Sequence, residues 1–315
     1  MLGNIVISLL LGAHVAVALP SLLRRAGVTA LATTEISSYK PYALLARAGY
    51  CPASKTSTWS CGSPCADIPG FVPYASGGDG VVTPFWYVGY HPSLKSVVIS
   101  NQGTDPSKFV PLLIDADFRL DTLDNTLFPG VSSAVKTHNG FQEAQKRSAT
   151  TKLAAVKKAI AERGTSLVTL TGHSLGGAIS LIDALYLSIN LPSATLKVVT
   201  HGMPRVGNPA FATLIDSKAR KILFLSAVIL PSSIQIKDLA HINNEKDIVP
   251  IVPGRGLGFA HPSGEKHILS PGNWVACSGQ DNTDPQCTIG TVPNVLVGDL
   301  GDHGGPYEGV SIGSC

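Results

Sequence analysis

The sequence has little net charge, which argues against partners that require a strongly charged surface. It contains 24 lysines and arginines against 21 acids among 315 residues, a formal charge of +3. The first 25 residues hold Arg24 and Arg25 and no acid, so the rest carries 22 basic against 21 acidic side chains, a net of +1. Such a balance gives no reason to expect nucleic acid or a strongly charged substrate as a partner.

The sequence also lacks a membrane-spanning segment at its N-terminus, although that end is apolar. The run from Ile5 to Val17, about 13 residues, is too short for a bilayer core of about 30 Å. It ends in Ala16-Val17-Ala18, a small-x-small cleavage pattern. We predict a signal peptide over residues 1–18, a pro-segment over 19–25 that ends at the dibasic pair Arg24-Arg25, and a secreted mature protein without a transmembrane segment.

The cysteine pattern indicates disulfides and not a metal site. Six cysteines, an even number, all lie in the mature part, and such a count in an exported chain is typical of disulfide bonding. Cys61 and Cys65 have a spacing compatible with zinc, but the chain lacks a second close pair or a His-x-x-x-His partner. No metal is expected. The chain also lacks an Asn-x-Ser/Thr sequon, so N-glycosylation is not expected.

Internal repeats and interdomain linkers are absent, so residues 26–315 are predicted to form one domain. Helical spacing runs from Glu35 to Tyr50 and from His138 to Arg163, and a hairpin is expected where His91-Pro92 separates two apolar runs. Strands alternating with helices predict an α/β fold with a mainly parallel central sheet flanked by helices. The glycines of 254–258 do not have dinucleotide-loop spacing, and no cofactor is expected.

The most informative stretch is Leu167 to Ala178, which contains Gly172-His173-Ser174-Leu175-Gly176. An apolar strand, a turn with the pattern Gly-x-Ser-x-Gly and a following helix are typical of the nucleophile elbow of serine hydrolases. Side chains two positions from the serine would collide with neighbouring elements, and glycine removes them. Ser174 is therefore the candidate nucleophile, and the N–H groups that open the helix are candidate oxyanion donors.

A serine hydroxyl needs a base, and that base needs an orienting acid. In this fold class the acid follows the nucleophile in the chain and the histidine comes last. Asp247 follows a short strand and is the preferred acid, with Glu245 and Asp238 as rivals. His303, in a glycine-rich loop, is the preferred base, with an expected pKa of about 6 to 7.

The other histidines have structural interpretations. His261 and His267 flank a turn and a strand, where structural hydrogen bonding is the commoner role. His173 points away from the nucleophile, so packing or hydrogen bonding is expected of it.

Four segments together resemble the fungal class 3 lipase family of α/β-hydrolases, which also includes feruloyl esterases. They are Gly172 to Gly177, Met203 to Asn208, Asp247 to Pro250 and His303 to Tyr307. The resemblance covers about Tyr39 to Cys315. It implies a triad of Ser174, Asp247 and His303 and an oxyanion hole formed by Thr104 and the N–H of Leu175. It also implies three disulfides, which are Cys51–Cys315, Cys61–Cys65 and Cys277–Cys287.

By the same resemblance, Asp105 to Asp117 is a lid. It carries large apolar side chains expected to cover Ser174 in water and to meet acyl chains at a lipid surface, namely Phe109, Val110, Leu112, Leu113 and Ile114. One departure from the family is the apolar run from Ile222 to Leu230. It can be read as an extra buried strand, as a loop that contacts acyl chains, or as translated intron sequence.

These observations predict a secreted serine hydrolase that cleaves carboxylic esters, with acylglycerols at a lipid interface as substrates, acting as a monomer. The first alternative is a feruloyl esterase with the same chemistry and a different pocket. The second is a catalytically inactive, disulfide-tied binding protein, against which the retention of all three triad residue types argues.

Overall fold

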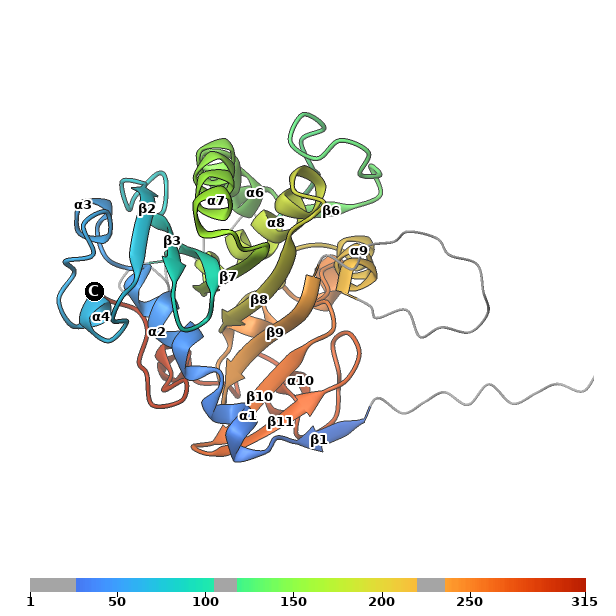
Figure 1. The fold of residues 1–315 in the computed structure, drawn as a ribbon. Coiled ribbons are helices and arrows are strands. Elements are labelled where there is room, and N and C mark those ends of the chain that lie inside the picture. The colour runs from blue at the N-terminus through green and yellow to red at the C-terminus, as the bar shows by residue number, and fades with distance from the viewer. Residues whose placement is uncertain (1–26, 105–117, 220–235) are drawn as a thin grey trace, which may run out of the picture.

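A computed structural model describes residues 27–104, 118–219 and 236–315. Among these residues, nine strands form the main sheet and two more form a small separate sheet (Figure 1). The strands of the main sheet are β1 (Val28–Ala30), β2 (Val72–Gly77), β3 (Trp86–His91), β4 (Ser96–Asn101), β7 (Leu167–His173), β8 (Thr195–His201), β9 (Ile236–Asn244), β10 (Glu265–Ser270) and β11 (Asn273–Cys277). The small sheet pairs β5 (Leu120–Thr122) with β6 (Lys136–His138).

The main sheet is parallel at its centre and antiparallel at both edges. Its order is β1-β11-β10-β9-β8-β7-β4-β3-β2, and the strands from β4 to β10 in this order are parallel. The edge pairs are antiparallel because short turns join β3 to β4 and β10 to β11, whereas parallel neighbours need a longer crossover. The prediction of a mainly parallel sheet is thus confirmed for the centre, and the predicted hairpin is the β3–β4 pair.

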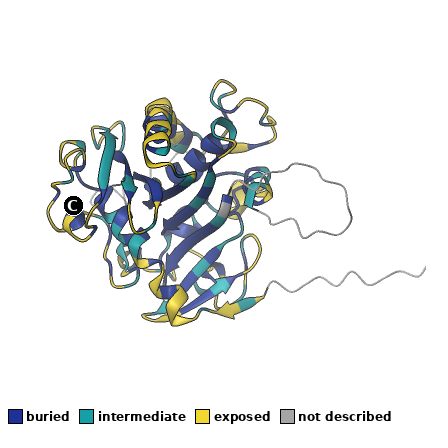
Figure 2. Ribbon diagram, in the orientation of Figure 1, coloured by how far each residue is buried: buried dark blue, intermediate teal, exposed yellow. Residues whose placement is uncertain are grey.

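The helices cover both faces of this sheet. They are α1 (Thr33–Ser37), α2 (Lys40–Ala48), α3 (Ala53–Thr56), α4 (Ser63–Ala66), α6 (Asn139–Lys146), α7 (Ala149–Arg163), α8 (Leu175–Asn190), α9 (Pro209–Ala219), α10 (Thr288–Thr291), and the 3-10 turns η1 (Val249–Ile251), η2 (Arg255–Leu257) and η3 (Leu300–Gly304). The central strands are buried, while the outward faces of the surrounding helices are exposed (Figure 2).

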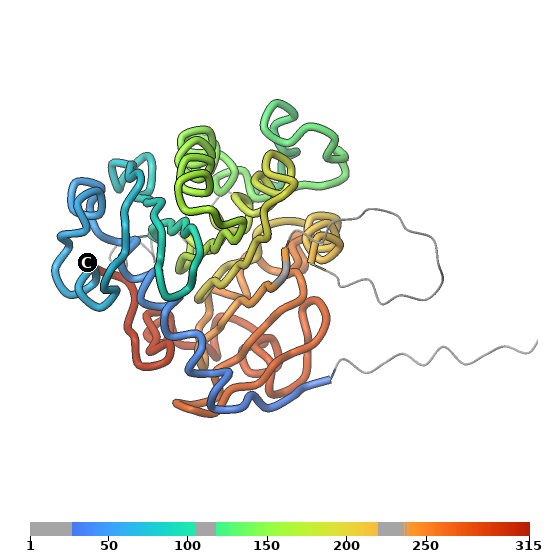
Figure 3. The backbone as a smooth tube through the Cα atoms, in the orientation of Figure 1, coloured from blue at the N-terminus to red at the C-terminus, as the bar shows by residue number. Residues whose placement is uncertain are grey.

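Alternation along the strands divides the core into two clusters. Val97 and Ile99 of β4 lie in the cluster with α7, α8 and α9, whereas Val98 between them lies in the cluster with α1 and α2. The second cluster also includes Tyr307 and Val310, so the C-terminal segment packs on the α2 side of the sheet (Figure 3). The sheet is therefore the middle of three layers.

The long helix predicted over His138 to Arg163 is wrong, because two helices, α6 and α7, occupy this range. They are separated at Arg147 and Ser148. The backbone of Ser148 is not helical (φ −124°, ψ −5°), and this residue begins α7 at the N-cap position, which serine favours. The end of the helical spacing at Arg163 is confirmed, since Gly164 closes α7 with a left-handed φ of 62°.

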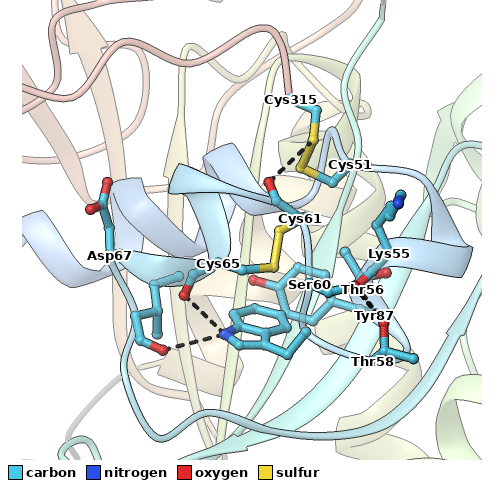
Figure 4. Close-up of a disulfide and its surroundings, with 12 residues drawn as sticks. Cys51, Lys55, Thr56, Thr58, Ser60, Cys61, Cys65, Asp67, Tyr87 and Cys315 are labelled. Carbon is cyan, nitrogen blue, oxygen red and sulfur yellow. Dashed lines mark hydrogen bonds between the residues drawn. A yellow bond between two sulfur atoms is a disulfide. The ribbon is translucent and has the colours of Figure 1, made fainter.

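The structure contains the disulfides Cys51–Cys315, Cys61–Cys65 and Cys277–Cys287, the same pairs that the family resemblance implies. The first ties the C-terminus to the residues after α2, next to the small Cys61–Cys65 loop (Figure 4). The chain-entropy treatment assigns such a long-range bridge up to about 5 kcal/mol of stability. Within the described ranges, no helix is both long and apolar enough to cross a membrane.

Candidate active site

Ser174 lies in the turn between β7 and α8, with the backbone that a nucleophile elbow requires. Its φ of 58° and ψ of −131° are conformations that residues other than glycine rarely adopt. A Cβ atom on Gly172 would collide with the backbone of Gly176, and one on Gly176 would collide with the Asn101 carbonyl. The two glycines of the motif are therefore required by close approach of backbone to backbone.

The hydroxyl of Ser174 has no hydrogen-bonding partner among the residues that the structure describes. Its side chain is 1% exposed. A buried hydroxyl without a partner is uncommon in native proteins and requires an explanation. A serine that is to bond a substrate provides one.

The predicted oxyanion donors lie on both sides of this serine. Leu175 is the first residue of α8, and an N–H at this position has no acceptor within its own helix. Thr104 follows Gly103, and a Cβ atom built on Gly103 would lie 3.1 Å from the Cβ of Ser174. The segment that carries Thr104 therefore runs directly beside Ser174.

Asp247 and His303 meet although 56 positions separate them in the chain. Asp247 is fully buried in the turn after β9, and His303 lies in η3. The Nδ1–H of His303 donates to Oδ2 of Asp247 at 2.8 Å, and the N–H of Val249 donates to Oδ1, also at 2.8 Å. This arrangement selects the tautomer in which Nε2 of the neutral ring is the basic atom.

The rival residues lie elsewhere. Asp238, near the start of β9, pairs with Lys197 at 2.7 Å. This pair lies near the starts of the parallel strands, whereas Ser174 follows the end of β7. Glu245 offers its backbone carbonyl to the Nε2 of His267 at 2.8 Å. His261 donates from Nε2 to the Pro250 carbonyl, also at 2.8 Å. The two histidines thus have the structural hydrogen bonds expected of them.

Two aromatic side chains hold the backbone carbonyl of His303, and a third holds one of those two; of these residues, sequence reasoning expected hydrogen bonding only of His173. Nε2 of His173 and the hydroxyl of Tyr307 donate to the carbonyl of His303 at 2.7 and 3.0 Å. Nδ1 of His173 accepts from the Tyr50 hydroxyl at 2.7 Å. Burial keeps the pKa of His173 well below its usual value, so this ring stays neutral. Tyr307 could have been suspected from its place in the His303-to-Tyr307 segment, whereas no sequence signal marks Tyr50.

Burial also changes the acid–base properties of the Asp247–His303 pair. It lowers the pKa of His303 to about 3 and raises that of Asp247 well above its usual value. The ionised Asp247, stabilised by the Val249 N–H, favours the charged ring and opposes the effect of burial on His303. Burial therefore moves the pKa of His303 downward from the value of about 6 to 7 expected from the sequence.

We therefore expect the acidic limb of the pH profile of kcat/KM to have its midpoint below pH 6. Activity requires the neutral imidazole, which protonates as pH falls through its pKa, so a lowered pKa extends activity toward acid. The profile should be measured from pH 4 to 8 on a soluble short-chain ester, with samples returned to pH 7 to show that any loss is reversible. A reversible midpoint at 6.5 or above would contradict this prediction.

Several predicted features lie outside the described residues. These include the apolar run from Ile222 to Leu230 and the lid from Asp105 to Asp117, with Phe109, Val110, Leu112, Leu113 and Ile114. The same holds for the signal peptide at 1–18 and the pro-segment at 19–25.

Comparison with known proteins agrees with this arrangement. The family described as "Lipase (class 3)" matches residues 98–257, which include Thr104, Ser174 and Asp247. The secreted mono- and diacylglycerol lipase MDL2 of Malassezia globosa is 32% identical over 72% of this chain and 69% of its own. A second protein of that fungus, the secreted mono- and diacylglycerol lipase LIP1, is 31% identical over 71% of this chain and 68% of its own.

Solved lipase structures share the fold. The Rhizomucor miehei lipase in its propeptide complex superposes with a TM-score of 0.75 at 26% identity, covering 91% of this chain and 85% of that one. The Lip2 lipase of Yarrowia lipolytica also gives 0.75 at 26% identity, covering 92% and 98%. These relatives are lipases, so the feruloyl esterase alternative is not favoured.

Three observations lead to one conclusion. They are the serine elbow, the lipase family match, which spans just over half of the chain, and the secreted lipases among the relatives. This chain belongs to the class 3 lipase family and is a secreted carboxylic ester hydrolase of the lipase type.

Proposed function

We propose that this lipase hydrolyses mono- and diacylglycerols at a lipid surface through Ser174, His303 and Asp247. The observation that carries the assignment is the 2.8 Å hydrogen bond between Asp247 and His303. The ring of His303 lies 4.3 Å, centroid to centroid, from that of His173, which directly precedes the strained Ser174. The names of the Malassezia relatives supply the substrate class.

In the proposed reaction, Oγ of Ser174 attacks the ester carbonyl while Nε2 of His303 takes the hydroxyl proton. Negative charge develops on the carbonyl oxygen, and the N–H groups of Thr104 and Leu175, with the Thr104 hydroxyl, stabilise it. The carbon–oxygen bond to glycerol then breaks, and His303 returns the proton to the departing alcohol. Asp247 holds the ring and stabilises the imidazolium form.

The acyl-enzyme is removed by water in the same way. His303 takes a proton from water, the hydroxide attacks the acyl carbon, and Ser174 leaves as the alcohol with the proton from His303. The products are a fatty acid and a glycerol with one acyl chain fewer, and the site needs no cofactor or metal for these steps.

Further parts of the proposal concern organisation. We infer that residues 26–315 act as one catalytic domain and that the enzyme works as a monomer. One sheet that takes strands from Val28 to Cys277, and a disulfide that joins Cys51 to Cys315, support the single domain.

The substrate class can be tested by comparing emulsified monoacylglycerol, diacylglycerol and triacylglycerol of one chain length with methyl ferulate. We expect kcat/KM for the first two to exceed that for methyl ferulate by on the order of 10²-fold or more, since differential transition-state binding sets this ratio. Ser174→Ala protein serves as the blank. A preference for methyl ferulate would overturn the proposal.

A further inference from the structure

A buried polar cluster lies behind the active site, at the place where β4, α6, α7 and α8 meet. The carboxylate of Asp183 is its centre. Oδ2 accepts from Nζ of Lys152 at 2.7 Å and from Nδ2 of Asn101 at 3.0 Å, and Oδ1 accepts from Nε2 of Gln145 at 3.0 Å. The strand and the three helices thus contribute one side chain each.

Every member of this cluster is removed from water. Lys152, Asp183 and Asn101 are each 1% exposed and Gln145 is 0% exposed. Replacing a buried ion pair with apolar residues of similar volume is often neutral or stabilising, so such a pair is weak evidence for a role in stability alone. The surroundings are apolar, with Val156 and Leu181 in the same core. A positional role for the cluster is therefore worth testing.

Asn101 connects this cluster to the catalytic elbow. It is the last residue of β4 and stands opposite Gly172 in the register with β7. Its amide also donates to Oγ of Ser180 at 2.9 Å, and that hydroxyl donates to the carbonyl of Thr171 at 2.6 Å. Its own carbonyl lies so close to Gly176 that no Cβ fits there. Asn101 is therefore held against the first turns of α8 on two sides.

From Asn101 the chain reaches Thr104 through two further anchored residues. Gln102 exchanges two hydrogen bonds with the backbone of Phe85, both at 2.8 Å. Gly103 follows and packs against the Tyr50 hydroxyl, the His173 carbonyl and Ser174. The position of Thr104 relative to α8 thus depends on where Asn101 is held.

We propose that Asn101 and the Lys152–Asp183 pair are positioning residues that hold the two oxyanion donors at the correct separation. Thr104 comes three residues after the strand that Asn101 ends, and Leu175 belongs to the helix that carries Ser180 and Asp183. The cluster joins these two segments directly behind the place where the ester carbonyl of the substrate would bind. This inference rests on the proposed function of Ser174, Thr104 and Leu175.

The test uses Asn101→Leu, which keeps the side-chain size and removes both donated hydrogen bonds. Removing one oxyanion donor costs about 10²- to 10³-fold in kcat, so a displaced donor should cost about 10- to 100-fold with KM nearly unchanged. Val156→Ala, one turn after Lys152 in the same helix, is the control that loses core packing but keeps every hydrogen bond of the cluster. When assayed well below its own melting temperature, this control variant should have the wild-type kcat.

A second readout separates positioning from general damage. A thionoester presents a sulfur that accepts hydrogen bonds poorly, so a working oxyanion hole favours the matched ester. In Asn101→Leu the ester-to-thionoester ratio of kcat/KM should fall about as far as kcat does, whereas Val156→Ala should leave it unchanged. The acidic limb of the pH profile should not move, because Asp247 and His303 are untouched.

If Asn101→Leu is insoluble, Ser180→Ala decides, since it removes one of the same hydrogen bonds with a smaller change and should lower the ratio severalfold. An unchanged ratio in soluble Asn101→Leu, or in Ser180→Ala if that variant must decide, would overturn the proposal. The proposed function fails separately, if wild-type protein does not hydrolyse esters or if Ser174→Ala retains the activity.

Discussion

Replacing Ser174 with alanine should lower kcat by on the order of 10⁴-fold or more, because it removes the nucleophile itself. The fold should be retained, since Oγ of Ser174 makes no hydrogen bond within the described part of the chain and alanine keeps the Cβ atom. Turnover of a soluble short-chain ester, together with circular dichroism and the melting temperature, measures both effects.

A matched control exists in the same helix. Ser188 is buried in α8, and its hydroxyl donates to the carbonyl of Leu185 at 2.8 Å, so Ser188→Ala removes a comparable group away from the elbow. That variant should keep nearly all activity. Turnover by pure Ser174→Ala above a few per cent of wild type would mean that another group is the nucleophile.

The second large effect is expected for Asp247→Asn, which should lower kcat by about 10⁴-fold. The amide can still accept the N–H of Val249, but it can no longer stabilise the imidazolium, and its own N–H favours the wrong tautomer of His303. The ring would then present Nε2–H to Ser174 instead of a lone pair. Initial rates on the same soluble ester measure the loss.

Glu245→Gln provides the comparison, because Glu245 was the nearest rival in the sequence and contacts His267 only through its backbone carbonyl. It should remain within about threefold of wild type, as most surface substitutions do. Equal losses in the two variants would show that Asp247 is not the orienting acid. Rescue of Asp247→Asn at raised pH would point instead to a purely electrostatic role.

Several features could be predicted from the sequence because local sterics or topology rules determine them. The glycines around Ser174 are needed wherever a strand turns sharply into a helix, so the elbow was recognisable before any tertiary contact was known. The turn at His91-Pro92 is short enough to allow only an antiparallel pair, and the structure contains that hairpin. At Ser148, where the backbone leaves the helical conformation and a second helix begins, the sequence pattern misled.

The sequence by itself thus determined the fold class, the sharp turn that carries Ser174 and the use of all six cysteines in disulfides. Only the tertiary structure decided which carboxylate faces His303, because Asp238, Glu245 and Asp247 lie within ten positions and differ chiefly in where β9 ends. It alone brought Tyr50 to His173 across 123 positions, and Asn101 to Asp183 across 82. The physical reason is that local patterns depend on sterics within one turn. The partners of a buried polar group depend instead on which strands and helices the whole chain packs together.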